Sequence, residues 1–215
     1  MKQHRLEGLS DGIFAIVMTI LVFEIRVPEY NHLISDRVLL EYIINSYPLF
    51  LSYLLSFSLL FTYWRGHHYI TSVLAKNVDT KLSNLNAVFF LFVGLVPFSS
   101  HLLGMYSYTG TAIVLFAVNI ILIGLPLYAM RHYVIKSSSI ENTPFTDVEN
   151  QHAYVRILLP IVIAIIAILV SFFDKSIALV FFTVAILFNL SGRSTRYMFS
   201  LINFFHPTNK NTPVQ

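Results

Sequence analysis

Residues 9–27 read LSDGIFAIVMTILVFEIRV, an apolar segment that carries charge near both of its ends. Twelve uncharged residues separate Asp11 from Glu24. As an α-helix they would span roughly 18 Å, whereas the hydrocarbon core of a bilayer is about 30 Å thick. A helix with two acids this close together either lies outside the membrane or crosses it where water or protein replaces lipid.

The composition of the chain favours the second case. Of the 215 residues, 56% are hydrophobic and only 12% are charged, compared with about 25% charged residues in a soluble domain. With a mean hydropathy of +0.69, the chain is predicted to be an all-α polytopic membrane protein. Although the pI is basic, the Lys and Arg residues do not form a basic stripe on which a nucleic acid could lie, so no nucleic-acid partner is expected. The absence of cysteine excludes disulfides and thiolate metal sites.

The uncharged runs predict six membrane-spanning helices in one transmembrane domain, residues 1–200. Residues 82–130 contain no Asp, Glu, Lys or Arg, and a single helix of that length would measure about 74 Å. This run must therefore turn, and the glycines that bracket GMYSYTG at residues 104–110 favour a turn there. Pro97 is expected to kink the third span. The predicted spans are residues 9–27, 42–66, 82–103, 111–130, 156–173 and 176–192, and residues 201–215 are predicted to form a disordered cytoplasmic tail.

Six spans place both termini on the same side of the membrane. The 14 Lys and Arg residues divide eleven to three in favour of that side, whereas the 11 acids divide six to five. Because cytoplasmic loops are enriched in Lys and Arg, both termini are predicted to be cytoplasmic. The protein is expected to be a multi-pass protein of a plasma membrane or bacterial inner membrane.

The middle of the first helix is apolar on all sides, which is typical of a helix buried among others. At 100° per residue, one face about 120° wide carries Leu9, Gly12, Ile13, Ile16, Thr19, Ile20, Phe23 and Val27, and the opposite face carries Phe14, Met18 and Leu21. The i, i+4, i+7 spacing of Ile16, Ile20 and Phe23 fits a helix-packing seam or the constriction of a pore, and spacing alone favours the seam.

Three stretches of sequence resemble the bacterial TMEM175-type potassium channels. The first is RLEGLSDGIFAIVMTILVFEIRVP at residues 5–28, which has an arginine, three residues, the position of an aromatic-Ser-Asp triplet, and a helix ending in an acid and a proline. The others are YWRGHH at residues 63–68 and LFVGLVPFSSHLLG at residues 91–104. Leu9 stands where the family usually has phenylalanine, and Phe23 stands where an aliphatic residue is usual.

The resemblance implies a homotetramer in the lipid bilayer, with the first helix of each subunit lining a central pore that conducts K⁺ passively. The family's constriction falls on Ile16, Ile20 and Phe23, and its pore threonine on Thr19. Four Ile16 side chains around a narrow axis would expel water and act as a hydrophobic gate. No TVGYG filter occurs in the chain, and no cofactor is expected. Other monovalent cations and H⁺ stay open as further permeant species.

The polar residues at the start of the first helix allow two interpretations. Ser10 or Asp11 can cap a helix that begins there, or they can bond to residues near the cytoplasmic end of the second span. The second interpretation predicts a cytoplasmic-end network of Arg5, Ser10, Asp11, Trp64, His67 and His68.

Other chemistry has little support in the sequence. His67 and His68 are adjacent, and His101 and His132 lack a histidine one helical turn away, so no metal site is expected. No GxSxG motif or phosphate-binding loop occurs, so the chain is not predicted to be an enzyme. Asn119 and Asn189 lie inside spans, where an amide is expected to bond to a neighbouring helix.

Two alternatives to the channel are a proton-coupled secondary carrier, or proton-leak channel, and a membrane scaffold. A carrier needs ionisable residues at mid-membrane depth, and His101 is the one titratable candidate near it.

Overall fold

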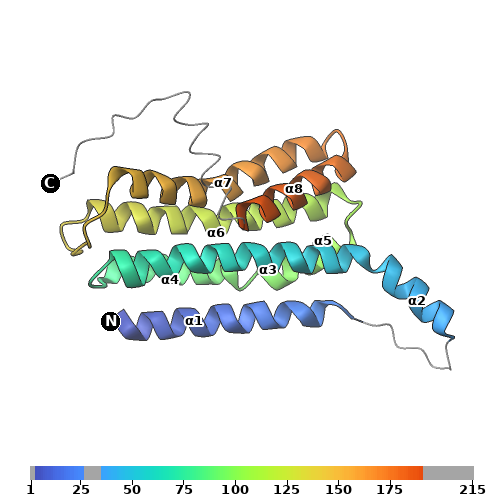
Figure 1. The fold of residues 1–215 in the computed structure, drawn as a ribbon, viewed down its shortest axis with the longest axis horizontal. Helices are drawn as coiled ribbons and strands as arrows, with labels where there is room; N and C mark the ends of the chain where they lie inside the picture. Colours follow the sequence, from blue (N-terminus) through green and yellow to red (C-terminus); the bar gives the residue numbers. More distant parts are fainter. Residues whose placement is uncertain (1–2, 27–34, 191–215) are drawn as a thin grey trace.

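The computed structural model describes residues 3–26 and 35–190, and its regular elements are helices (Figure 1). They are α1 (Gln3–Ile20), the 3-10 helix η1 (Leu21–Glu24), α2 (Asp36–Asn45), α3 (Tyr47–His68), the π-helix η2 (Tyr69–Leu74), α4 (Thr80–Val93), α5 (Val96–Met105), α6 (Gly110–Lys136), α7 (Asp147–Ser171) and α8 (Lys175–Leu190).

The lengths and composition of these helices match a membrane protein. In the described part of the chain, five helical segments are long and apolar enough to cross a bilayer: Gln3–Glu24, Tyr47–Leu74, Thr80–Met105, Gly110–Lys136 and Glu149–Ser171. A shorter apolar helix, Lys175–Val184, follows them. The prediction of an all-α polytopic membrane protein is confirmed.

Several helices begin or end outside the predicted spans. The first begins at Gln3 rather than at residue 9, and the second continues past residue 66 to Leu74. The polar connection expected at residues 131–155 is mostly helical, because α6 ends at Lys136 and α7 begins at Asp147. A charged residue marks where a helix leaves the membrane and not where the helix ends. Residues 191–192 and the predicted tail, residues 201–215, lie outside the described residues.

Several helices begin at a side chain that caps them. The Asp79 side chain accepts a hydrogen bond from the Leu82 N–H at 2.8 Å and starts α4. Thr146 and Glu149 form a reciprocal capping box at the start of α7. Each cap satisfies backbone N–H groups that have no partner inside the helix.

The third span is two helices. α4 ends at Val93 and α5 begins at Val96, with Pro97 in the first turn of α5. Proline is tolerated there because the first N–H groups of a helix have no intrahelical partner. The kink expected at Pro97 is therefore a break immediately before it.

Small and polar residues let the helices approach closely, as is common in membrane proteins. A Cβ added at Gly104 of α5 would lie 2.6 Å from Ser52 Oγ, and one added at Gly124 of α6 would lie 2.6 Å from Ile161 Cγ1. The Asn119 amide donates to Ser99 Oγ at 2.9 Å. This bond joins α6 to α5 and confirms the interpretation of Asn119; the Asn189 side chain lies outside the described residues.

α1 lies at the edge of the bundle beside α3 and α4 (Figure 1). The end of the bundle where α1 begins also holds the ends of α3 and α6 and the starts of α4 and α7 (Figure 1). We call it the basic end, after Arg65, Lys76, Lys81, Arg131, Lys136 and Arg156.

Candidate functional site

One face of α1 packs against the rest of the chain. Its buried residues recur every three or four positions, which keeps them on one side of a helix. They are Leu6, Ser10, Phe14 and Val17, followed by Leu21 in η1. This face holds α1 against α3 and α4.

The opposite face of α1 is exposed in the single subunit. It contains the three predicted constriction residues, of which Ile16 is 59% exposed, Ile20 38% and Phe23 70%. Gly12 and Thr19 are exposed on the same face. The described residues supply neighbours for only one side of α1, so the single subunit alone does not bury this helix all round as its apolar sequence predicted.

Thr19 keeps its hydroxyl hydrogen inside the helix. Its Oγ1 lies 2.9 Å from the carbonyl oxygen of Ala15 and 2.8 Å from that of Ile16, and the hydrogen is shared between these two acceptors. The lone pairs of Oγ1 stay available on the exposed face. Thr19 therefore offers an oxygen acceptor in the middle of an otherwise apolar surface.

His67 connects α1 to α4 through buried hydrogen bonds. Its Nδ1 lies 3.0 Å from Ser10 Oγ, and its Nε2 contacts Asn86 Oδ1. Because the Asn86 Nδ2 donates to the Leu82 carbonyl at 3.0 Å, the amide oxygen faces the ring and Nε2 carries the hydrogen. Nδ1 then accepts a hydrogen bond from the Ser10 hydroxyl. Partners on two helices thus fix one tautomer of a neutral imidazole.

The His67 ring is fully enclosed, with 0% of its surface exposed. It stacks on Phe89 with ring centroids 5.1 Å apart, and Phe90 and Phe14 lie 5.3 and 6.3 Å away. These rings shield the Ser10–His67–Asn86 bonds from solvent. The sequence did not identify Asn86, although an amide inside an apolar run was a signal of an interhelical partner.

Asp11 anchors α1 to α3 at the surface. Its Oδ1 accepts a hydrogen bond from the Trp64 indole at 2.9 Å, and Trp64 stacks on His68 with centroids 5.7 Å apart. Arg5, which the sequence placed in the same group, is exposed and forms none of these bonds. The capping interpretation is wrong, because α1 begins at Gln3 and both Ser10 and Asp11 lie within it.

At the other end of α1, Glu24 lies against His101 of α5. Glu24 Oε2 is 2.9 Å from His101 Nδ1, and the two side chains are 22% and 33% exposed. The ring nitrogen has no hydrogen-bond partner, so the two side chains are in close contact without a hydrogen bond between them. The sequence singled out His101 but did not predict this partner.

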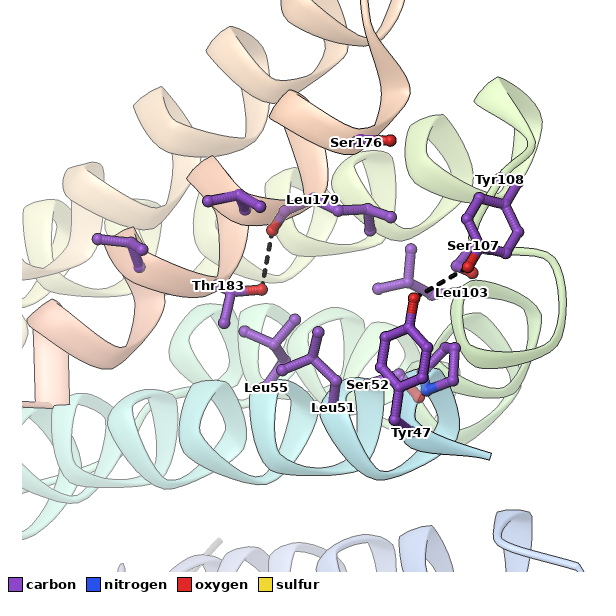
Figure 2. A pocket seen from close by; sticks show the side chains of 13 residues that line it. Tyr47, Leu51, Ser52, Leu55, Leu103, Ser107, Tyr108, Ser176, Leu179 and Thr183 are labelled. Atoms are coloured by element: carbon purple, nitrogen blue, oxygen red, sulfur yellow. Dashed lines mark hydrogen bonds between the residues drawn. The ribbon is translucent and has the colours of Figure 1, made fainter. Parts of the chain in front are cut away.

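The remaining chemistry of the described residues is sparse. In residues 3–26 and 35–190, no three His, Asp or Glu side chains converge as metal ligands. A crevice of about 260 Å³ opens between α3, α5 and α8 (Figure 2). Its lining carries no charge, the Tyr47 and Tyr108 hydroxyls bond to each other at 2.9 Å, and Thr183 donates to the Leu179 carbonyl at 2.8 Å. This crevice involves no residue of α1 and is not part of the site.

Comparison with known proteins links the α1 site to ion channels. A family model described as the endosomal/lysosomal potassium channel TMEM175 matches residues 5–97. This range contains nearly all of α1 with its exposed face, and the residues of the Ser10–His67–Asn86 bonds.

Three similar proteins are named as potassium channels. That of Chryseobacterium sp. (strain P1-3) is 28% identical over 183 residues, which are 85% of this chain and 89% of that protein. That of Chamaesiphon minutus is 38% identical over 47% of this chain and 49% of its own length. That of Streptomyces collinus is 32% identical over 49% of each protein. The last two matches therefore span about half of each relative.

A solved structure shares the fold. The crystal structure of a lysosomal potassium-selective channel TMEM175 homolog from Chamaesiphon minutus matches with a TM-score of 0.72 at 24% identity, over 89% of this chain and 97% of that chain. The resemblance to the TMEM175 family that the sequence indicated is confirmed.

Proposed function

We propose that this protein is a potassium-permeable channel in which four copies of α1 surround a central axis and ions pass along its exposed face. The similar proteins that are named as potassium channels support K⁺ as the permeant ion. The number of subunits rests on the resemblance to the TMEM175 family. The function is passive transport, and no catalytic chemistry takes part.

The observation that carries the proposal is the two-sided character of α1. One side is packed into the subunit, and the other presents a line of exposed residues, Gly12, Ile16, Thr19 and Phe23. Asp11 lies at one end of this line and Glu24 at the other, and ionised groups within a membrane are costly unless water or protein surrounds them. Water-filled entrances at both ends of a shared pore would solvate both acids.

The narrow part of this pore would be hydrophobic. Ile16 and Ile20 are one helical turn apart, about 6 Å along the axis, and Phe23 follows in η1. Rings of these side chains repel water at small radius, so an ion loses hydration until the helices move apart and the path wets. The same side chains therefore act as constriction and as gate.

Thr19 would supply the polar contact within this apolar path. Its hydroxyl hydrogen is engaged by backbone carbonyls, so four Oγ1 atoms would turn lone pairs toward the axis. Oxygen ligands replace part of the hydration shell of a cation. No TVGYG sequence supplies a carbonyl filter, so selectivity would depend on pore radius and on these hydroxyls.

The charge distribution supports an orientation. The basic end of the bundle carries the excess of Lys and Arg, which favours the cytoplasmic side of the membrane. Both chain termini would then be cytoplasmic in a plasma membrane or bacterial inner membrane.

The test is K⁺ flux from liposomes that contain the purified protein, measured under a K⁺ gradient without a pH gradient. Ile16→Asn should raise the flux because a polar ring wets more readily, and Ile16→Trp should block it because the ring fills the axis. Ile177 on α8 is also 59% exposed and lies away from α1. The matched controls Ile177→Asn and Ile177→Trp should leave the flux unchanged.

Three outcomes would refute the proposal. Equal flux from both Ile16 variants would remove Ile16 from the constriction. No flux above that of empty liposomes would favour a scaffold. Flux that saturates and requires a proton gradient would favour a carrier, in which Glu24 and His101 would be the ionisable pair to examine first.

A further inference from the structure

Arg131 is a buried cation with no matching anion among the described residues. It lies on α6 near the basic end, its side chain is 0% exposed, and its Nε and Nη1 atoms have no hydrogen-bond partner in the described part of the chain. Buried guanidinium groups are normally paired with a carboxylate or phosphate, because an unpaired buried charge is costly. Two of the three nitrogens of this group are left without an acceptor.

The neighbours of Arg131 satisfy it only in part. Its Nη2 donates to Asn150 Oδ1 at 3.0 Å. The guanidinium carbon lies 5.7 Å from the centre of the Tyr69 ring and 5.4 Å from that of Tyr154, distances at which aromatic faces attract a cation. Neutral groups of this kind stabilise the charge but do not neutralise it.

Arg131 lines a small pocket together with two more arginines. The pocket has a volume of about 170 Å³, and Arg65 of α3 and Arg156 of α7 belong to its lining. Its other lining residues in the described part of the chain are Thr62, Tyr63, Gly66, Tyr69, Leu127, Ala153 and Ile157, and none of these is acidic. An anion in this space would offset the positive charge of Arg131 and accept hydrogen bonds from its Nε and Nη1 atoms.

We propose that this arginine pocket binds a phosphate group, either that of an anionic phospholipid or that of a soluble phosphate. Planar guanidinium groups offer paired N–H donors that match phosphate oxygens. One water occupies about 30 Å³ in the liquid. The pocket of about 170 Å³ is therefore large enough for a phosphate group, which would displace several waters. The pocket lies between membrane-spanning helices at their basic end, where basic pockets meet lipid head groups.

The crevice of Figure 2 differs from the arginine pocket in the charge and the bonding of its lining. That crevice is roomier, but its lining is uncharged and its tyrosine and threonine hydroxyls are already bonded. The arginine pocket is smaller and holds unsatisfied charged donors. Recognition of an anion depends on the donors and not on the volume.

The test uses the purified full-length protein in detergent micelles. Thermal unfolding and native mass spectrometry would be recorded with phosphatidylglycerol, with phosphatidylcholine, and with inorganic phosphate in chloride buffer of equal ionic strength. The wild-type protein should bind phosphatidylglycerol or phosphate in preference to phosphatidylcholine. In the Arg65→Gln/Arg156→Gln variant the affinity should fall by about tenfold or more, because each substitution removes charged hydrogen-bond donors to the anion.

Lys136→Gln is the matched control. It removes a positive charge from an exposed position on α6, the helix that carries Arg131, and should leave the affinity unchanged. Arg131→Met should abolish binding if the variant folds, and the double variant keeps the test decisive if it does not.

Binding of phosphatidylglycerol that depends on the arginine pair identifies a lipid head group as the ligand, and binding of phosphate alone identifies a soluble one. The proposal is overturned if the wild-type protein binds neither, or if the double variant and Lys136→Gln bind equally well. The readout is binding and not ion flux, so this proposal and the channel proposal fail independently.

Discussion

The hydrogen bonds of His67 predict an interaction between two residues that do not touch. Replacing Asn86 with Leu removes the acceptor of Nε2–H, and the ring can respond by moving its hydrogen to Nδ1, which faces Ser10 Oγ. Replacing Ser10 with Ala removes the donor to Nδ1 and leaves Nε2–H bonded to Asn86. Each single variant therefore leaves only a ring lone pair without a partner.

In the double variant Ser10→Ala/Asn86→Leu, neither tautomer of His67 has a hydrogen-bond acceptor for its N–H. Either tautomer now places an N–H in an environment that is 0% exposed and enclosed by Phe14, Phe89 and Phe90. Losing one hydrogen bond costs about 0.5–1.5 kcal/mol, whereas an unsatisfied buried donor costs about 1–3 kcal/mol. The double variant should thus lose about 1 kcal/mol more than the sum of the singles, which is about 2–4 °C in Tm for a chain of this size.

The assay is thermal unfolding in detergent, followed by the fluorescence of Trp64, the single tryptophan of the chain. The same two substitutions in a His67→Leu background provide the control, because without the ring their effects should add. Additivity within about 0.5 kcal/mol in the wild-type background, as distant independent sites show, would refute the proposed tautomer and its coupling of α1 to α4.

Two further predictions concern packing and pH. Gly124→Ala would bring a Cβ to 2.6 Å from Ile161 Cγ1, so it should destabilise the protein by about 1–3 kcal/mol in thermal unfolding. The control Gly12→Ala has nothing within 4 Å of the added Cβ and should not destabilise it. Equal effects of the two substitutions would contradict the close approach of α6 and α7. Burial opposes the ionisation of Asp79, but hydrogen bonds from the Tyr133 hydroxyl and from backbone N–H groups outweigh it and lower its pKa. The stability that this provides is present above the unfolded pKa of about 3.9 and is lost as the pH falls through the folded value. Tyr133→Phe should therefore make Tm less sensitive to pH between about 6 and 3, and identical pH profiles would show that the bond does not matter.

The membrane character of the chain and the presence of a helix in its first apolar segment were predictable because both depend on local composition. The long uncharged runs required spanning helices, and the charges of Asp11 and Glu24 set the first apart from the rest. The helix ends were not predictable in this way. Hydropathy registers where a helix meets water, whereas caps such as Asp79 and Thr146 determine where it stops.

The partners within the site could not be derived from spacing. Ser10 and His67 are far apart in the sequence, and their contact depends on how α1 packs against α3. One interpretation of the sequence placed both residues in one group, but it did not include Asn86, which completes the chain of bonds and lies in a run that was interpreted only as uncharged. Arg131 was counted only as a charge of a cytoplasmic loop, since its burial depends on the packing of three helices.

The bonds at Ser10 also determine how α1 can move. They fix the helix near the basic end, whereas toward Phe23 it is held by apolar packing and by the Glu24 contact with His101. From Ser10 the helix rises about 9 Å to Ile16 and about 20 Å to Phe23. If α1 pivots at Ser10, a tilt of about 5° displaces Phe23 sideways by about 1.7 Å and Ile16 by only about 0.8 Å. In the proposed channel, the ring of side chains nearest the pivot would then widen least, and Ile16 would be the last point of the path to open.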